Sequence, residues 1–214
     1  MKPARGAGLA TQAVVRSAVR APRWAWAVAT GFGSGYLRPA PGTWGSLSGL
    51  IAWLLVTVPL ATAFSGWVMA HRDASYLGYR IYGAELLFLL APVAMTWLAV
   101  RASDRVVLET GEKDPGYIVA DEWAGMWITL WPLRWEIAQH WHRLSGPGGW
   151  RWLPALLVPF LVFRLFDIWK PWPIRQIQVL PGGSGVVADD VVAGLYGVPV
   201  VMLAAPLVLN NLLR

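Results

Sequence analysis

Five carboxylates stand at the edges of apolar runs, where an ionised side chain costs several kcal/mol unless it has a partner or a metal. These residues are Asp121, Glu122, Asp167, Asp189 and Asp190. The chain has no cysteine, and its three histidines lie in other segments. Oxygen ligands without thiolate or imidazole favour a hard cation, so Mg²⁺ is the expected metal. A local ion pair is the alternative for any single carboxylate, but five at corresponding ends favour a site.

A basic stripe accompanies one of these carboxylates in the stretch FRLFDIWKPWPI, residues 163–174. Arg164, Asp167 and Lys170 follow at three-residue steps, so on a helix they form one slanted stripe that Pro171 brings to an end. If Asp167 binds the metal, Arg164 would clasp a phosphate bidentately and Lys170 would act on it as a point charge. For this stretch alone, a salt-bridge ladder within the helix is the alternative.

The segment 31–46 is dense in glycine and proline and contains a G-x-G-x-G pattern. No strand pattern precedes it and no Lys-Ser/Thr follows it, so it fits neither a dinucleotide-binding turn nor a P-loop. As a loop, it would offer backbone N–H groups to an anion, with Arg38 and Ser34 as candidate phosphate contacts. A plain connecting loop is the alternative.

Two acidic pairs, 121–122 and 189–190, are each followed by a glycine, Gly125 and Gly194. Adjacent carboxylates diverge by about 100° on a helix, so one member of each pair is expected to face the metal. The other member would hold a basic side chain or a helix N-terminus. The glycines would let two helices approach closely. Asp114, at a turn before the first pair, is a further candidate ligand.

The elements that must position these residues are apolar. Hydrophobic residues make up 56% of the 214 residues and charged residues only 14%. Several apolar runs approach the ~20 residues that cross a bilayer core, and they lie at about 46–64, 84–100, 117–133, 152–169 and 186–213. The sequence therefore predicts an all-α fold, a polytopic membrane bundle with about five membrane-embedded helices. The third helix is either a span or re-entrant. Residues 26–214 would form a single membrane-embedded domain.

Basic residues dominate the start of the chain, where seven lysines and arginines precede the first acidic residue, Asp73. Residues 1–25 are predicted to be a basic segment, amphipathic or disordered, that stays on the cytoplasmic side. No basic groove motif indicates nucleic-acid binding. With a cytoplasmic N-terminus, the five carboxylates and the Gly-rich segment all fall at cytoplasmic helix ends. The sequence thus predicts a multi-pass protein whose active site faces the cytoplasm.

Four blocks together resemble the phosphatidylglycerophosphatase A family over residues 31–196. They are GFGSG with APGTWGSL, DPGYIVADEWAGMWITL, FRLFDIWKPWPI and GGSGVVADDVVAGLY. The resemblance implies an Mg²⁺-dependent enzyme of the bacterial inner membrane. Such an enzyme removes the terminal phosphate of phosphatidylglycerophosphate and releases phosphatidylglycerol. The family's metal and catalytic groups would fall on the five carboxylates named above.

The predicted reaction is metal-assisted hydrolysis of a phosphomonoester, with water attacking in line. Arg164 and Lys170 would stabilise the charge of the transition state, and either Asp190 or Glu122 would act as general base. An aspartyl-phosphate intermediate is the mechanistic alternative. From a different functional class, a cation- or proton-coupled transporter would also use intramembrane carboxylates, but it would place them near the bilayer midplane.

Overall fold

The computed structural model of the chain describes residues 20–70, 77–134 and 153–213, and every regular element in these ranges is helical. The all-α prediction is therefore confirmed for this part of the chain. The elements are α2 (Arg23–Ala29), η1 (Ser34–Tyr36), α3 (Pro41–Ala70), α4 (Leu77–Thr110), α5 (Ala120–Leu130), η3 (Trp131–Leu133), α7 (Leu153–Trp169), α8 (Ile174–Ile177) and α9 (Gly182–Leu213).

Each of the five predicted apolar runs overlaps a helix, but the helix bounds differ from the run bounds. The helix α4 continues past the expected end at residue 100 to Thr110. The apolar run marks only the hydrophobic part of this helix, and its last ten residues are largely polar. The Gly-rich segment was expected to be a loop up to residue 46, whereas α3 already begins at Pro41. The helix α2 begins two residues before the predicted domain boundary at residue 25, and residues 1–19 lie outside the described part.

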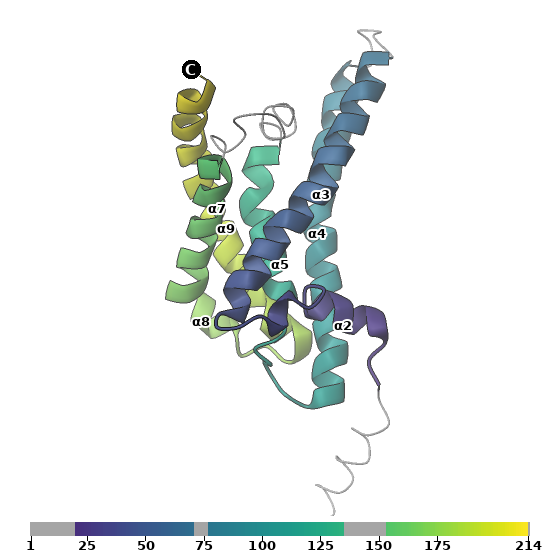
Figure 1. Ribbon diagram of the computed structural model, residues 1–214, viewed down its shortest axis with the longest axis vertical. Helices are drawn as coiled ribbons and strands as arrows, with labels where there is room; N and C mark the ends of the chain where they lie inside the picture. The colour runs from purple at the N-terminus through teal and green to yellow at the C-terminus, as the bar shows by residue number, and fades with distance from the viewer. Residues whose placement is uncertain (1–19, 71–76, 135–152, 214) are drawn as a thin grey trace, which may run out of the picture.

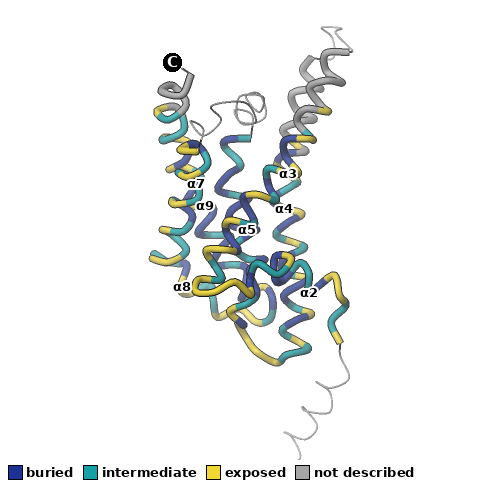
Figure 2. Tube along the Cα trace, in the orientation of Figure 1, coloured by how far each residue is buried: buried dark blue, intermediate teal, exposed yellow. Residues whose placement is uncertain are grey.

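The short helix α5 forms the centre of the bundle, and α3, α4, α7 and α9 pack around it (Figure 1). Most of its residues are buried, including Trp123, Met126 and Leu130 (Figure 2). Its eleven residues extend about 16 Å, roughly half of a bilayer core. The short helix α2 lies across the end of the bundle against α4.

Glycines allow the central helix to pack closely against α9. A Cβ on Gly194 would lie 2.5 Å from the carbonyl oxygen of Gly125, and one on Gly125 would lie 2.5 Å from that of Asp190. Real side chains do not tolerate such distances to backbone atoms, so both positions require glycine. The expected close approach at these two glycines is confirmed, and it places the start of α5 beside Asp190.

A second glycine stripe, on α3, faces the start of α5. Added Cβ atoms at Gly45 and Gly49 would meet Val119 at 2.6 Å and Trp123 at 3.1 Å. Gly45 belongs to the segment 31–46, for which the sequence suggested an anion-binding loop, and Gly49 lies one helical turn further along α3. Their observed role is helix packing, which brings the first turn of α3 against the acidic pair of α5.

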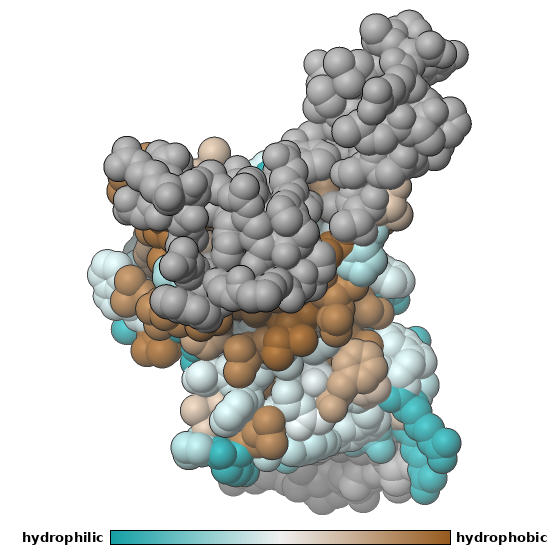
Figure 3. All heavy atoms as spheres, turned by 45° about the horizontal axis from the view of Figure 1, so that its top comes forward, coloured by the Kyte–Doolittle hydropathy of each residue, from teal (hydrophilic) through white to brown (hydrophobic). Residues whose placement is uncertain are grey.

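Large apolar side chains are exposed on the outward faces of all four long helices. Leu55 on α3, Val93 on α4, Leu161 on α7 and Leu203 on α9 are each more than half exposed. Hydrophobic side chains gather in a band on the face shown in Figure 3, with hydrophilic ones below it. Two described segments, Pro41–Leu60 and Gly182–Ala205, are long and apolar enough to cross a membrane. This exposed apolar band indicates a membrane protein.

Candidate active site

Three of the predicted carboxylates converge at one end of the bundle. Asp121 and Glu122 lie in the first turn of α5, and Asp190 lies on α9. One oxygen from each lies within 4.8 Å of the other two. Among the described residues, no lysine or arginine forms an ion pair with any of these three, which we call the acidic trio.

The acidic trio suits a divalent cation by donor type and by spacing. Glu122 Oε2 is buried without a hydrogen-bond partner, so one ligand position is open. Asp121 Oδ1 accepts the backbone N–H of Glu122 at 3.0 Å, and the N-terminal end of α5 favours negative charge. Three carboxylates this close need positive charge from outside the protein, and oxygen ligands of this kind are those that Mg²⁺ prefers.

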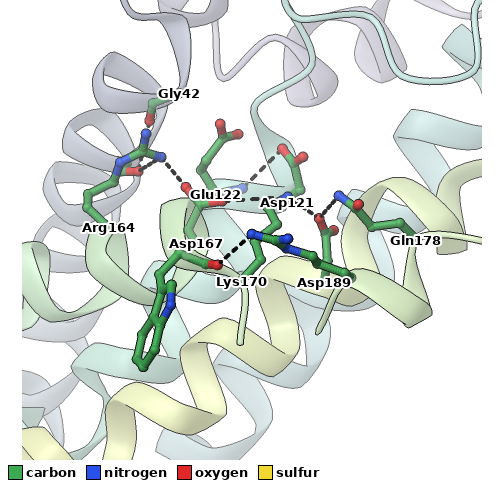
Figure 4. Close-up of polar contacts among 11 residues, drawn as sticks. Gly42, Asp121, Glu122, Arg164, Asp167, Lys170, Gln178 and Asp189 are labelled. Carbon is green, nitrogen blue, oxygen red and sulfur yellow. Dashed lines mark hydrogen bonds and ion pairs between the residues drawn. The ribbon is translucent and has the colours of Figure 1, made fainter. Parts of the chain in front are cut away.

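The other two carboxylates, Asp167 and Asp189, are held by cations (Figure 4). Arg164 Nη1 donates to Asp167 Oδ2. This is the ion pair within one helix that the salt-bridge alternative predicted. Lys170 Nζ lies 2.5 Å from Asp189 Oδ2 and 4.0 Å from Asp167 Oδ1. The contact between Lys170 and Asp189 joins the end of α7 to α9, so the arrangement is more than a ladder within one helix.

The end of α7 directs Lys170 toward α9. The helix ends at Trp169, in agreement with the expected effect of Pro171, and Lys170 has a left-handed φ of 46°. Burial alone would lower the pKa of Lys170, but its hydrogen bond to Asp189 and the charges of three nearby aspartates raise the pKa above its usual value. Lys170 therefore remains protonated and positive at the site.

Arg164 connects the cation-held carboxylates to the acidic trio. A Cβ on Gly42 would lie 2.5 Å from Glu122 Oε1 and 3.1 Å from Arg164 Nη1, so both groups meet over this glycine. Arg164 Nη1 also donates to Ser46 Oγ at 3.4 Å. The guanidinium group thus lies beside the trio, where it can contact an anion bound there.

Two polar residues at the site were not predicted to contact the charged side chains, although Ser46 ends the predicted Gly-rich segment. Gln178 Nε2 donates to Asp189 Oδ2 at 2.7 Å, and Ser46 accepts from Arg164. Gln178 follows α8, and no spacing pattern relates it to Asp189. Ser46 lies one turn beyond Gly42 on α3, so its place beside a stripe of glycines was the available signal.

Three other candidates lie apart from the acidic trio. Ser34 Oγ hydrogen-bonds with Ser48 Oγ at 2.8 Å, which helps to pack the Gly-rich loop on α3. Arg38 is exposed and lines a separate cavity of about 230 Å³. Asp114, in the loop before α5, is not a member of the trio, but burial and the nearby charge of Asp189 raise its pKa, so it lies close to the carboxylates that the cations hold.

Comparison with known proteins identifies relatives along most of the chain. Residues 27–205 match the family model of phosphatidylglycerophosphatase A. A phosphatidylglycerophosphatase A of Escherichia coli is 32% identical over 169 residues, which are 78% of this chain and 76% of that protein. The protein of the same name from Haemophilus influenzae is 35% identical over 175 residues, 81% of this chain and 84% of its own.

A third relative carries a different name. A Bacteroides thetaiotaomicron protein named for a phosphatidylinositol-3-phosphatase activity is 31% identical over 177 residues, 83% of this chain and 91% of its own. No solved structure matches the chain. None of the relatives supports the transporter alternative. By its sequence match from residue 27 to residue 205, the chain belongs to the phosphatidylglycerophosphatase A family.

Proposed function

We propose that this protein hydrolyses the terminal phosphomonoester of phosphatidylglycerophosphate to phosphatidylglycerol and inorganic phosphate. The observation that carries the proposal is the convergence of the acidic trio with Arg164 and Lys170 at one end of the bundle. Membership of a phosphatase family supplies the reaction class and the lipid. The site supplies what phosphoryl transfer needs, which is charge neutralisation and positioning.

Asp121, Glu122 and Asp190 would hold Mg²⁺, because these three carboxylates lack a cation of their own. When bound, Mg²⁺ supplies a Lewis acid that draws negative charge from the phosphate oxygens. Asp167 and Asp189 already bind Arg164 and Lys170, so their first role in this proposal is to position these cations. They remain candidates for additional ligands.

Arg164 and Lys170 would bind the phosphate and stabilise the charge that develops on it. Both are held in place by aspartates before the substrate arrives, which lowers the cost of reorganisation. A carboxylate oxygen of Glu122 or Asp190 that does not hold the metal would accept the proton of the attacking water. The water oxygen forms the new bond to phosphorus, the ester bond to glycerol breaks, and the departing oxygen takes a proton from solvent.

We further propose that five helices embed the chain in a bacterial inner membrane, with the site at the cytoplasmic end. The exposed apolar faces of α3, α4, α7 and α9 support four of the crossings. The helix α5 would enter between them, shielded from lipid by their packing, which explains why its buried residues are not all strongly hydrophobic. Arginines and lysines beside the site support a cytoplasmic location.

Phosphate release from purified protein tests this function. We expect release from phosphatidylglycerophosphate in mixed micelles, its loss with EDTA and its recovery with added Mg²⁺. Phosphatidylinositol-3-phosphate serves as the competing substrate, because one relative is named for that activity. Faster release from this lipid than from phosphatidylglycerophosphate would overturn the proposed substrate, and full activity in EDTA would overturn the metal.

Quench-trapping with labelled phosphate separates the two chemical routes. Direct attack by water leaves no labelled protein when turnover is stopped with acid, whereas an aspartyl-phosphate would be labelled on the chain. We expect no labelled protein, because in this proposal a carboxylate of the trio takes the proton of the attacking water. A labelled carboxylate that forms and decays at the rate of turnover would refute direct attack.

A further inference from the structure

The outer face of α4 bears a groove that lies apart from the acidic trio. It has a volume of about 540 Å³ and runs between α4, α5 and α9, with Val93, Trp97, Ile128 and Leu195 among its lining residues. The phosphate-binding cations Arg164 and Lys170 belong to α7 and the turn after it, on another side of α9. The groove is therefore a separate feature of the bundle.

The lining of this groove is hydrocarbon almost throughout. Its hydroxyl-bearing residue Thr96 already donates to the carbonyl oxygen of Pro92 at 2.8 Å, so it offers no free donor. Val93, Trp97 and Leu195 are each more than half exposed. One polar group of the lining is free, since the indole N–H of Trp131 is buried without a hydrogen-bond partner. The rest of the lining is apolar, so a cavity of this size suits an acyl chain.

The side chain of Arg101 lies beside Trp97, a residue of the groove lining. Trp97 and Arg101 are one turn apart on α4, and the Arg101 guanidinium lies 5.4 Å from the centre of the Trp97 ring. Arg101 is exposed and forms no ion pair within the part of the chain that the structure describes. The adjacent acidic residue, Asp104, accepts the backbone N–H of Gly183 and is thereby held toward α9.

We propose that this groove binds one anionic phospholipid, with an acyl chain between α4 and α9 and its phosphate at Arg101. Val93 and Arg101 lie about two turns apart on α4. In a bilayer, a phospholipid is the molecule that carries hydrocarbon at the first position and negative charge at the second. Trp97 would lie between them at the level of the interface. The inference rests on the proposed membrane embedding, and the bound lipid is a resident of the groove and not the substrate in turnover.

Contact between α4 and α9 separates this lipid from the acidic trio. A Cβ on Gly183 would lie 2.6 Å from the backbone nitrogen of Asp104, so the two helices touch at the cytoplasmic end of the groove. Asp190 and Val191 are neighbours on α9, but only Val191 lines the groove, while Asp190 faces Asp121 and Glu122. A lipid in the groove is thus expected to affect retention and stability and to leave catalysis unchanged.

Native mass spectrometry of the full chain in neutral detergent tests the proposal. Phosphatidylglycerol and phosphatidylcholine with the same acyl chains are added in turn, and the retained lipid is counted. We expect phosphatidylglycerol to be retained preferentially, and the Arg101→Gln variant to weaken its binding about fivefold. The Val93→Trp variant, which fills the groove, should reduce the retention of both lipids.

A matched charge control is Arg23→Gln, which removes an exposed arginine on α2 away from the groove. Equal retention of the two lipids by the unaltered chain would overturn the proposal, as would equal losses in Arg101→Gln and Arg23→Gln. A raised KM for phosphatidylglycerophosphate in Arg101→Gln would show instead that the groove holds the substrate. Unchanged kcat and KM in that variant, with reduced lipid retention, is the expected result and also shows that the variant is folded.

Discussion

The two halves of the acidic site differ in what neutralises them. The charges of Asp167 and Asp189 are balanced by Arg164 and Lys170, so this group of four is neutral as a whole. The acidic trio carries three negative charges and pairs with no lysine or arginine among the described residues. Buried like charges without a counter-charge are costly, so the trio is the half that we propose as the metal site.

Proximity to the site does not by itself make a carboxylate a metal ligand. All five carboxylates satisfy the same sequence criterion, but the end of α7 supplies cations to two of them. The acidic pair on α9 is divided between the halves, since Asp190 joins the trio while Asp189 accepts from Lys170 and Gln178. The pair on α5 stays together in the trio.

The largest expected effect comes from removing one charge from the trio. Asp190→Asn keeps the size of the side chain but removes a ligand, and we expect kcat/KM for phosphate release to fall at least about 100-fold. The Mg²⁺ concentration for half-maximal activity should rise with it. The neighbouring variant Asp189→Asn should lose activity roughly tenfold at an unchanged Mg²⁺ requirement. Equal losses and equal Mg²⁺ shifts in the two variants would contradict the division of the site.

A change in helix packing should pull the acidic trio apart without removing a charge. Gly194→Ala would press a methyl group against the backbone of Gly125, so α5 and α9 must move apart. We expect a loss of about 1–3 kcal/mol in the free energy of unfolding. We also expect roughly a tenfold to hundredfold loss of kcat, because Asp190 would shift from Asp121 and Glu122. Thermal unfolding in detergent and phosphate release measure the two effects.

The control for this packing change is Gly116→Ala, where an added Cβ would meet nothing within 4 Å and φ is not left-handed. It should leave both unfolding and activity unchanged. If Gly194→Ala behaved in the same way, the close contact between α5 and α9 would not be what aligns the trio. If both variants lost activity, a general sensitivity to alanine would be the simpler explanation.

Sequence patterns predicted the carboxylates because charge is rare and costly in apolar runs. They also predicted the helices, since each run of apolar residues overlaps one. They did not predict that α5 has only eleven residues, because a central helix shielded from lipid has no apolar length requirement of its own. Gly42 and Gly45 of α3 were assigned to a loop, because glycine occurs both in turns and where helices pack closely. Only the packing partner distinguishes the two roles.

The role of Gln178 could not be predicted from the sequence, for a related reason. Its role depends on how the turn after Lys170 and the short helix α8 return the chain to α9, and this path is set by tertiary contacts. A neutral amide in a polar segment carries no signal of cost, unlike a carboxylate in an apolar one. The residues that hold the charged groups in place are therefore harder to predict than the charged groups themselves.

The smallest expected effect comes from Gln178, which donates to a carboxylate of the cation-held half of the site. Asp189 Oδ2 accepts from both Lys170 and Gln178, so Gln178→Ala leaves one donor and should reduce kcat only about twofold to tenfold. The Mg²⁺ requirement should stay unchanged, because the trio is intact. Gln176→Ala is the matched control, since Gln176 lies exposed on α8. A loss in Gln178→Ala as large as that in Asp190→Asn, or a shifted Mg²⁺ requirement, would mean that the two halves act as one metal site.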